Sequence, residues 1–561
     1  MSAHLDIYLL DTLRPSESHL ITVATSSSKP IFMNIATTLN EDSPIPRNMQ
    51  ASRSHTTGDG EKALDSVSNT SDENRDTVPA MMPSIEKGRP NGDPNIVDWN
   101  GPDDLENPMN FSTSFKIINI GIVSFLTFVT PLGSSMFAPG VPQLQAEFGS
   151  TSALLADFVV SVYILGFAIG PLALAPTSEL YGRAIIYHIC NIGFIVFSVA
   201  CAVSTNLSQL IVFRFFQGCF GSAPITIGGG TIADLVPQQS RGGVIAIYSL
   251  GPIFGPVIGP VAGGYLVAAR GWRWVFWVLA IIGGGLFILS LAFLRETYPT
   301  VLLKRKTKRL IKETGNTNLR SKQDGGETVR QLFLLSILRP SKMLIFSPIV
   351  LATSLYGGIV YGYQYLMFTT FTFVFQEQYD FPTKSVGLSF LGFGVGSLIG
   401  VIVVGVASDR ILKAKSKPTP ESPSGAMRPE YRLPPLIICA FVIPAGLFWY
   451  GWSAQYKYHW IVPIIGTGFI GFGSIGVFMC IISYLVDAFA IFAASALAAT
   501  TVVRSILGAL LPLAGQSLYQ ALGLGWGNSL LGFIAVACIP VPLILMRYGE
   551  RWRLKLDVST L

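Results

Sequence analysis

The chain contains 561 residues, of which 50% are hydrophobic and only 13% are charged. Because soluble globular proteins carry about 25% charged residues, this composition excludes a soluble protein and indicates one that crosses a membrane several times. The net charge of +6 comes from a few polar segments. We attribute it to loops that lie against an anionic cytoplasmic membrane surface rather than to a nucleic-acid partner.

The first polar segment, residues 1–113, is predicted to form a disordered cytoplasmic tail. It is rich in Ser, Thr, Asn, Asp and Pro and shows no sustained hydrophobic periodicity. A short apolar run that begins near Ile21 is interrupted by three serines and a proline, so it is too polar to span a bilayer. No secretory signal peptide is evident, and we expect the first spanning helix to act as the targeting signal.

Twelve stretches of roughly 20 apolar residues follow the tail, and this is the length that a bilayer core requires. The predicted spans are residues 116–138, 153–176, 185–204, 207–231, 243–267, 273–294, 345–374, 386–407, 434–453, 460–483, 493–516 and 527–547. Six spans precede a long polar segment and six follow it. We therefore predict an all-α polytopic membrane protein with two six-helix bundles (114–294 and 344–548), a cytoplasmic central loop (295–343) and a C-terminal tail (549–561).

The distribution of basic residues predicts the orientation of these spans. The central loop contains twelve Lys or Arg against four acids, and the segment after the eighth span and the C-terminal tail are also basic. The loops on the opposite side contain only four basic residues. The positive-inside rule then places both termini and the central loop in the cytoplasm.

Two short turns on the predicted cytoplasmic side carry a similar pattern of charges. After span two, Glu179 precedes Gly182 and Arg183, and after span eight, Asp409 precedes Arg410 and further basic residues. A carboxylate close to a cation on such a turn can form an ion pair in one transport state and release it in the other. We predict that the two turns are gates, and the alternative is that they are ordinary basic loops that contain an acid.

The fourth predicted span contains a cation, Arg214, followed one turn later by Gln217. A charge at this depth costs about 3 kcal/mol on insertion scales, and such residues usually mark a substrate or proton pathway. Because an arginine keeps its proton under ordinary conditions, we expect Arg214 to set the field around a carboxylate or water, or to hold Gln217.

The fifth predicted span repeats the dipeptide Gly-Pro at every fourth residue. The repeat comprises Gly251, Pro252, Gly255, Pro256, Gly259, Pro260 and Gly263. Glycines at this spacing allow close contact between helices, and prolines remove backbone donors and bend the helix. The repeat predicts a tight, bent helix contact, with or without a further role in transport.

Neither a metal site nor a nucleotide site is predicted. The six cysteines and five histidines show no ligand spacing, and no GxxxxGK[ST] loop occurs. We also find no constellation of catalytic residues in the spans, so we expect no cofactor and no enzyme activity.

Taken together, these motifs resemble the major facilitator superfamily, and more narrowly the twelve-span drug:proton antiporters of fungi. Leu210, Arg214, Gln217 and Gly218 are similar to the fourth-helix signature that is associated with proton transfer in that family. The Gly-Pro repeat is similar to the fifth-helix signature of its antiporters, and the two charged turns resemble its gating motif. The similarity covers roughly residues 97–550, and the first turn departs from the motif, for example with Glu179 in place of Asp.

The resemblance implies that a proton carrier and a substrate cavity exist. Asp157, near the outer end of span two, is the candidate proton carrier, although it could instead cap the helix or meet the outer water. The acids at the cytoplasmic ends of spans, Asp234 and Asp487, are interpreted as latches or caps. A second intramembrane cation, Arg504 in span eleven, is either functional or close enough to the membrane surface to extend its charge into water.

The seventh span is aromatic and carries the predicted wall of the substrate cavity, Tyr361, Gln364 and Tyr365. An aromatic wall with a few polar groups suits apolar, planar or weakly cationic ligands. The alternative is that these tyrosines serve packing or anchoring at the membrane interface.

The resemblance implies proton-driven efflux of hydrophobic small molecules by alternating access, with span five as the interface against which the bundles rock. The molecules would be drugs, xenobiotics or a secondary metabolite that the same organism makes. We expect a monomer in the plasma membrane or the vacuolar membrane, with protons and lipid as its other partners. The alternatives are an importer, a polyamine:proton antiporter, which should have more carboxylates in its cavity, and a membrane sensor that does not transport.

Overall fold

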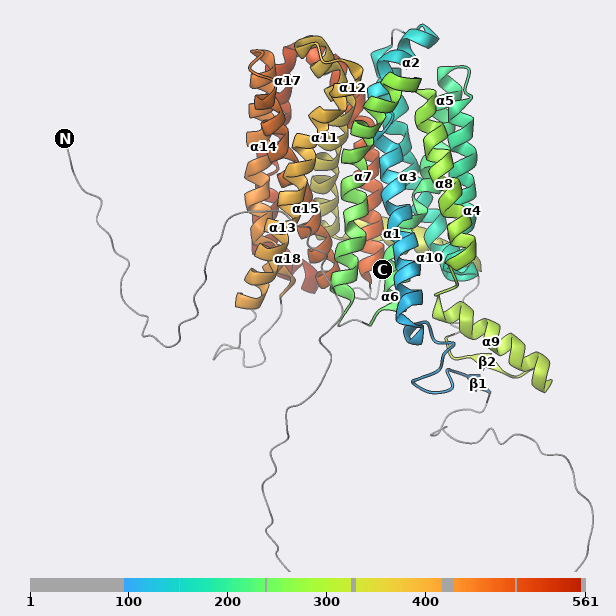
Figure 1. Ribbon diagram of the computed structural model, residues 1–561. Coiled ribbons are helices and arrows are strands. Elements are labelled where there is room, and N and C mark those ends of the chain that lie inside the picture. Colours follow the sequence, from blue (N-terminus) through green and yellow to red (C-terminus); the bar gives the residue numbers. More distant parts are fainter. Residues whose placement is uncertain are drawn as a thin grey trace, which may run out of the picture. The chain divides into compact units, whose positions relative to one another are not determined.

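The computed structural model describes residues 95–150, 152–237, 240–323, 329–415, 428–489 and 492–555, and these residues are almost entirely helical (Figure 1). The first half of the molecule consists of α1 (Thr113–Ser135), η2 (Ala138–Gly140), α2 (Val141–Phe148), α3 (Ala153–Tyr181), α4 (Arg183–Ala202), α5 (Leu207–Gly221), α6 (Ala223–Leu235), α7 (Arg241–Arg270) and α8 (Arg273–Phe293). We call the two ends of the helices the α2 end and the α9 end, after the short elements that lie there in Figure 1.

A connector leads to the second half. The connector contains α9 (Pro299–Thr314), β2 (Arg320–Ser321) and α10 (Val329–Phe346). The second half consists of α11 (Pro348–Tyr379), α12 (Thr383–Val386), η3 (Gly387–Ser389), α13 (Phe390–Lys415), η4 (Pro429–Arg432), α14 (Pro434–Gln455), α15 (Ile461–Phe489), α16 (Ala493–Leu510), η6 (Leu511–Ala514), α17 (Gly515–Ala537) and α18 (Pro540–Lys555).

Among the described residues, ten stretches are long and apolar enough to cross a membrane, and the strongly bent pair α10–α11 adds an eleventh. One of the ten, Ala493–Leu554, is 62 residues long and contains the last two predicted spans. Its helix α17 is broken at Gly523, whose φ of 73° no ordinary helical residue adopts. The protein is therefore a multi-pass membrane protein, while the count of twelve and the cytoplasmic termini stay predictions.

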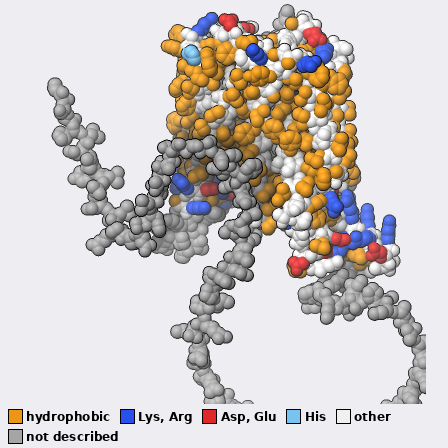
Figure 2. Space-filling model, in the orientation of Figure 1, with side chains coloured by type: hydrophobic (Ala, Val, Ile, Leu, Met, Phe, Trp, Pro, Cys, Tyr) orange, Lys and Arg blue, Asp and Glu red, His pale blue; other side chains and the backbone are white. Residues whose placement is uncertain are grey.

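The outer surface agrees with a membrane location. Figure 2 shows hydrophobic side chains along the flanks of the helices and charged side chains gathered at the two ends. Large apolar residues such as Ile247 and Ile288 are 66% and 70% exposed on these flanks. Such exposure is expected where lipid rather than water is the solvent.

The two halves repeat one pattern of helix packing. In the first half, α1 packs against α7, α3 against α5, and α4 against both α5 and α8. In the second half, α11 packs against α16, α13 against α15, and α14 against both α15 and α17. The halves meet where α3 packs along α16 and where α7 packs against α12 and α13. This is the arrangement expected of internal repeats around a shared central site.

The segment before α1 corrects the prediction that residues 1–113 are disordered throughout, because residues 95–110 pair with the connector. Its strand β1 (Ile96–Val97) pairs in parallel with β2, and Lys306 of α9 donates a hydrogen bond of 2.8 Å to Asp104. The helix α9 begins with a proline, and Gly315, where φ is 70°, follows its last residue. We call this unit, residues 95–110 with α9 and β2, the clasp. The sequence prediction missed it because each partner is too short and too polar to be stable alone, and residues 1–94 lie outside the described residues.

Candidate transport site

Arg214 lies in the middle of α5, and none of its surface is exposed. Its guanidinium donates five hydrogen bonds, and a guanidinium has five N–H donors. The acceptors are Gly133 O at 2.9 Å, Ser134 O at 3.0 Å, Val159 O at 3.1 Å, Val160 O at 3.4 Å and Gln217 Oε1 at 3.4 Å. The cation is therefore fully satisfied by the protein itself.

The two shortest of these bonds explain why a cation is needed at this point. The helix α1 ends at Ser135, so the carbonyls of Gly133 and Ser134 belong to its last turn and have no partner within the helix. Arg214 supplies the missing donors, and its charge faces the negative end of the helix dipole. It thereby fastens the end of α1 to α3 and α5.

Gln217 extends this network to α4. Its Oε1 accepts from Arg214, and its Nε2 donates to Ser198 Oγ at 2.8 Å. The ring of Tyr163 lies 4.9 Å from the guanidinium carbon and adds a cation–π contact. Arg214 and Gln217 are therefore brought together, as their spacing suggests, but as a buried clamp among four helices.

Asp157, the predicted proton carrier, lies apart from this clamp. It is 1% exposed, and its Oδ1 accepts a hydrogen bond of 3.2 Å from Gln516 at the start of α17, in the other half. Its Oδ2 has no hydrogen-bond partner among the described residues. The structure thus places the carboxylate at a contact between the two halves, and no ion pair joins it to Arg214 in the described part of the chain.

The predicted cavity wall lies on α11, where this helix faces the first half. Tyr365 is buried, and its hydroxyl lies 3.1 Å from Ser134 Oγ of α1. Tyr361 lies beside it with ring centroids 4.9 Å apart, and both Tyr361 and Gln364 are partly buried. Tyr361 and Tyr365 therefore lie near the boundary between the halves.

The glycines of the Gly-Pro repeat all face α1. These are Gly251, Gly255, Gly259 and Gly263. A Cβ atom at Gly255 would lie only 2.7 Å from the carbonyl oxygen of Phe128, and one at Gly259 would lie 2.9 Å from that of Leu132. Glycine is therefore required for α1 and α7 to approach as closely as they do.

The prolines of the repeat, Pro252, Pro256 and Pro260, leave carbonyls of α7 without their usual donors. The carbonyl of Pro256 would normally accept from the amide of residue 260, but Pro260 has no N–H. The hydroxyl of Ser135 donates to it instead, at 3.0 Å. The repeat is thus completed by a side chain of α1, as spanning helices with prolines require.

The repeat was expected to form the interface between the bundles, and the structure places its four glycines against α1 instead. A different face of α7 meets the second half. At that contact the glycines belong to η3 and α13 of the second half. A Cβ atom at Gly387 would overlap the backbone at Pro260, and one at Gly394 would overlap the side chain of Val257. The glycines of the repeat therefore pack within the first half, while Pro260 of the same repeat and the neighbouring Val257 meet the second half.

The first predicted gate is built around Arg183, at the start of α4. Arg183 Nε lies 2.9 Å from Asp234 Oδ2 at the end of α6, and both side chains are 11% exposed. The buried Glu296 accepts hydrogen bonds from the amides of Arg183 and Ala184 and so caps α4. Gly182 has a φ of 106°, and a Cβ atom there would collide with Glu296. Glu179 is exposed at the end of α3.

The second predicted gate uses a different cation from the one expected. Asp409 pairs with Arg432 at 2.9 Å, and Arg432 also pairs with Asp487 at the end of α15, at 3.0 Å. Arg410, the residue next to Asp409, points to an exposed position instead. Successive residues on a helix point in different directions, so the cation at the start of the next helix is better placed.

Sequence reasoning missed Glu296, Arg432 and Ser134 as parts of these networks. The internal repeat could have found Arg432, because it stands before α14 as Arg183 stands at the start of α4. Each pairs with an acid at the end of the next span, Asp234 of α6 and Asp487 of α15. Glu296 and Ser134 act through contacts that are distant in the sequence, and no local pattern indicates them.

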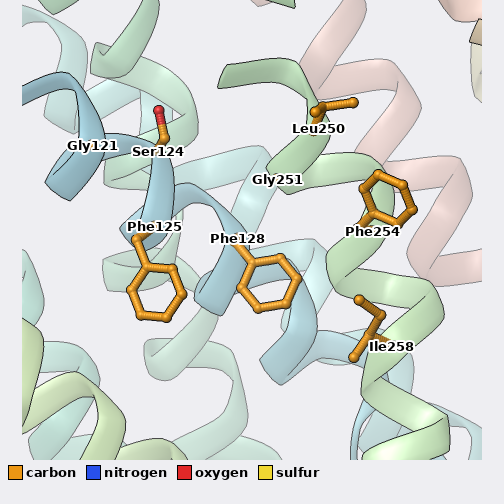
Figure 3. Close-up of a pocket in the computed structure, with 8 residues that line it drawn as sticks. All are labelled: Gly121, Ser124, Phe125, Phe128, Leu250, Gly251, Phe254 and Ile258. Atoms are coloured by element: carbon orange, nitrogen blue, oxygen red, sulfur yellow. The ribbon is translucent and has the colours of Figure 1, made fainter. Parts of the chain in front are cut away.

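An apolar groove of about 350 Å³ lies between α1 and α7 (Figure 3). Its lining residues are Gly121, Ser124, Phe125, Phe128, Leu250, Gly251, Phe254 and Ile258. Apart from the hydroxyl of Ser124, it offers no side-chain polar group that could orient a ligand. It contains none of the predicted wall residues, so we do not assign it as the transport site.

Residues 123–512 match the sequence profile of the family described as Major Facilitator Superfamily. The chain belongs to this superfamily. Its members are transporters, so this transporter is not an enzyme. Two relatives are the MFS-type transporter tndD of Aspergillus flavipes, 74% identical over 84% of this chain and 87% of its own length, and the MFS-type transporter penM of Penicillium rubens, 56% identical over 82% and 90%.

A third relative is named an efflux pump. It is radE of Floropilus chiversii, 52% identical over 85% of this chain and 88% of its own length. Among solved structures, the xylose transporter XylE from E. coli, in a partially occluded inward open conformation, gives a TM-score of 0.59 at 17% identity and covers 78% of this transporter and 98% of its own chain. This likeness shows the fold alone.

Proposed function

We propose that this transporter exports hydrophobic small molecules across the plasma membrane, in exchange for protons and by alternating access. The molecules are drugs, xenobiotics or a metabolite of the producing organism. The observation that carries the proposal is the similarity over nearly the whole membrane domain to a relative named an efflux pump.

The position of Asp157 supports proton coupling. Its carboxylate accepts a hydrogen bond from Gln516 across the contact between the halves, in a site that is shielded from solvent. When the halves part at this contact, the carboxylate changes its surroundings, so its affinity for a proton differs between the two states. A proton that binds one state more tightly than the other shifts the equilibrium between them.

The position of the cations argues against the polyamine alternative. Arg214 and Arg504 both lie within spanning helices. Arg214 lies over the ring of Tyr163 inside the first half, and Arg504 lies over the ring of Tyr361 near the boundary of the halves. A polycationic substrate would be repelled by these charges in a medium of low dielectric constant.

The proposal is tested in a pump-deficient yeast that expresses the full chain. We would measure the accumulation of a cationic dye, of azole-type drugs and of aromatic acids, with and without a protonophore. We expect at least one compound to accumulate less, and this effect to disappear with the protonophore and in Asp157→Asn.

The matched control for Asp157→Asn is Glu377→Gln, which neutralises an exposed acid near the α2 end of α11. It should export normally. If every compound accumulates unchanged although the protein is in the membrane, the proposed export of such molecules is refuted. A variant without residues 1–94 tests the sensor alternative, since an exporter should still pump without them.

A further inference from the structure

We propose that Arg504 binds the negatively charged group of the transported molecule, so that the substrate is a hydrophobic anion such as a carboxylate, or an ionised phenol or enol. This inference rests on the proposed function, because it names the chemical class of the molecule that is exported.

Arg504 lies on the side of α16 that faces α11 and the first half. Gly508, one turn further along α16, lies against the ring of Tyr361 and against Ile164 of α3, because a Cβ atom there would meet both. Arg504 itself lies over the ring of Tyr361, with its guanidinium carbon 4.8 Å from the ring centroid. It is thus next to the predicted cavity wall.

The guanidinium of Arg504, on a half-buried side chain, has no hydrogen-bond acceptor from the protein among the described residues. No hydrogen bond and no ion pair is formed by it within the described ranges, and its Nε is buried without an acceptor. It lies over the ring faces of Tyr361 and Phe478, and its guanidinium carbon is 5.6 Å from the centroid of the Phe478 ring. Ring faces attract a cation, but they leave its N–H donors without acceptors.

Extension of the side chain to the membrane surface does not explain this charge. Arg504 is eleven residues beyond the first residue of α16, Ala493, which is about 16 Å along a helix that rises 1.5 Å per residue. Its side chain is directed at α11 and α15 instead of the helix end. A cation held at this depth usually serves a function.

The geometry suits one kind of ligand. A guanidinium presents paired N–H donors that match the two oxygens of a carboxylate. The adjoining rings of Tyr361, Tyr365 and Phe478 form a connected aromatic surface, which suits the apolar body of the same molecule. An anion with an aromatic or aliphatic body would therefore satisfy both the donors and the rings.

The test uses the purified full chain in detergent, with three probes that share one ring system. These are 2-naphthoate, its uncharged methyl ester and 2-naphthylmethylammonium. We expect 2-naphthoate alone to raise the melting temperature of the wild type, and at least tenfold weaker binding of it by Arg504→Gln. Arg504→Lys keeps the charge but not the paired donors, and should bind with intermediate affinity.

A readout without ligand tests the same point. Because the unliganded cation forms no hydrogen bond to the described residues and its Nε is buried, Arg504→Gln should melt at or above the temperature of the wild type. A variant that melts well below the wild type would show that Arg504 is structural and would overturn the proposal. The proposal also fails if 2-naphthoate shifts the wild type no more than the ester does, or if phosphatidylglycerol reproduces the whole effect, since the site would then hold a lipid headgroup.

These measurements need no proton gradient, so they can be separated from the proposed function. Binding of 2-naphthoate that depends on Arg504, without export of any anion from yeast, would leave the anion site standing and refute export. Proton-driven export that is unchanged in Arg504→Gln would support the proposed function and refute the anion site.

Discussion

The two arginines within the spanning helices look alike in the sequence but differ in their surroundings. Arg214 is enclosed in the first half and donates five hydrogen bonds to protein acceptors. Arg504 is half-buried near the boundary of the halves. It lies over the rings of Tyr361 and Phe478 and forms no hydrogen bond or ion pair with the described residues. The first therefore holds helices together, and the N–H donors of the second have no acceptor among the described residues.

The difference arises from the backbone near each cation. Arg214 meets the end of α1, where carbonyls are free because the helix stops at Ser135. Arg504 meets the middle of α11, an unbroken helix of 32 residues whose carbonyls are already bonded. An intramembrane cation thus indicates a ligand site only where the protein leaves its N–H donors without acceptors.

The largest effect is expected for Arg214→Gln. The change leaves the carbonyls of Gly133 and Ser134 buried without donors, and we expect the free energy of unfolding to fall by about 3 kcal/mol or more. The melting temperature in detergent should drop steeply, in contrast with Arg504→Gln. Equal melting temperatures for the two variants would contradict the distinction drawn between the two arginines.

The next prediction concerns a glycine of α7 that packs against α1 and a glycine of α8 that packs against nothing. Gly255→Leu should abolish export while the protein remains in the membrane, because its side chain would collide with the backbone of α1 at Phe128. Overpacking of this kind costs about 1–3 kcal/mol. Gly284→Leu is the control, since a Cβ atom at Gly284 in α8 meets nothing within 4 Å. Export would be measured against the amount of protein in the membrane, and normal export by Gly255→Leu would refute the requirement for close packing.

A third test compares cations that are paired with carboxylates. Asp234→Asn removes the partner of the buried Arg183 and should destabilise the α9 end of the first half by about 2 kcal/mol. Asp409→Asn affects an exposed pair, whose acid is 65% exposed, and should cost less than about 1 kcal/mol. Hydrogen exchange at the starts of α4 and α14 would measure both effects. A larger change in the second half would show that burial does not set the strength of these pairs.

The sequence could predict the elements that depend on local pattern. Long apolar runs predict the spans. Glycines at every fourth residue predict that the Gly-Pro repeat packs closely against another helix. It could not predict which helix the repeat contacts, because that depends on the rotation of α7 about its axis. Local spacing alone also could not assign Asp409 to Arg432 rather than Arg410, because 22 residues lie between Asp409 and Arg432 in the sequence.

The same limit explains why the clasp was taken for part of a tail and a loop. Asp104 and Lys306 are far apart in the sequence, and each lies in a polar segment that lacks a spanning signal. Only their pairing reveals that residues 95–110 have a fixed partner in the connector. The composition of each segment does not predict an ion pair between the two segments, and the structure shows it.

The smallest effect is expected when this pair is weakened by pH or by Asp104→Asn. Burial alone would raise the pKa of Asp104, but the hydrogen bond from Lys306 and those from the amides of Asn100 and Glu106 together lower it below the ordinary value of 3.8. Docking of the clasp therefore has its full strength at any pH above that value, and loses it as the pH falls through the lowered pKa. Replacement of the carboxylate by an amide should cost about 1 kcal/mol at neutral pH.

Limited proteolysis of residues 95–110 should be faster in Asp104→Asn than in the wild type, and Asp103→Asn, which neutralises the neighbouring exposed acid, should behave like the wild type. Equal protection of all three proteins would show that the Lys306 pair does not hold the clasp together. Because the clasp lies at the α9 end and not at the boundary of the halves, proton-driven export should continue in Asp104→Asn at a rate close to that of the wild type.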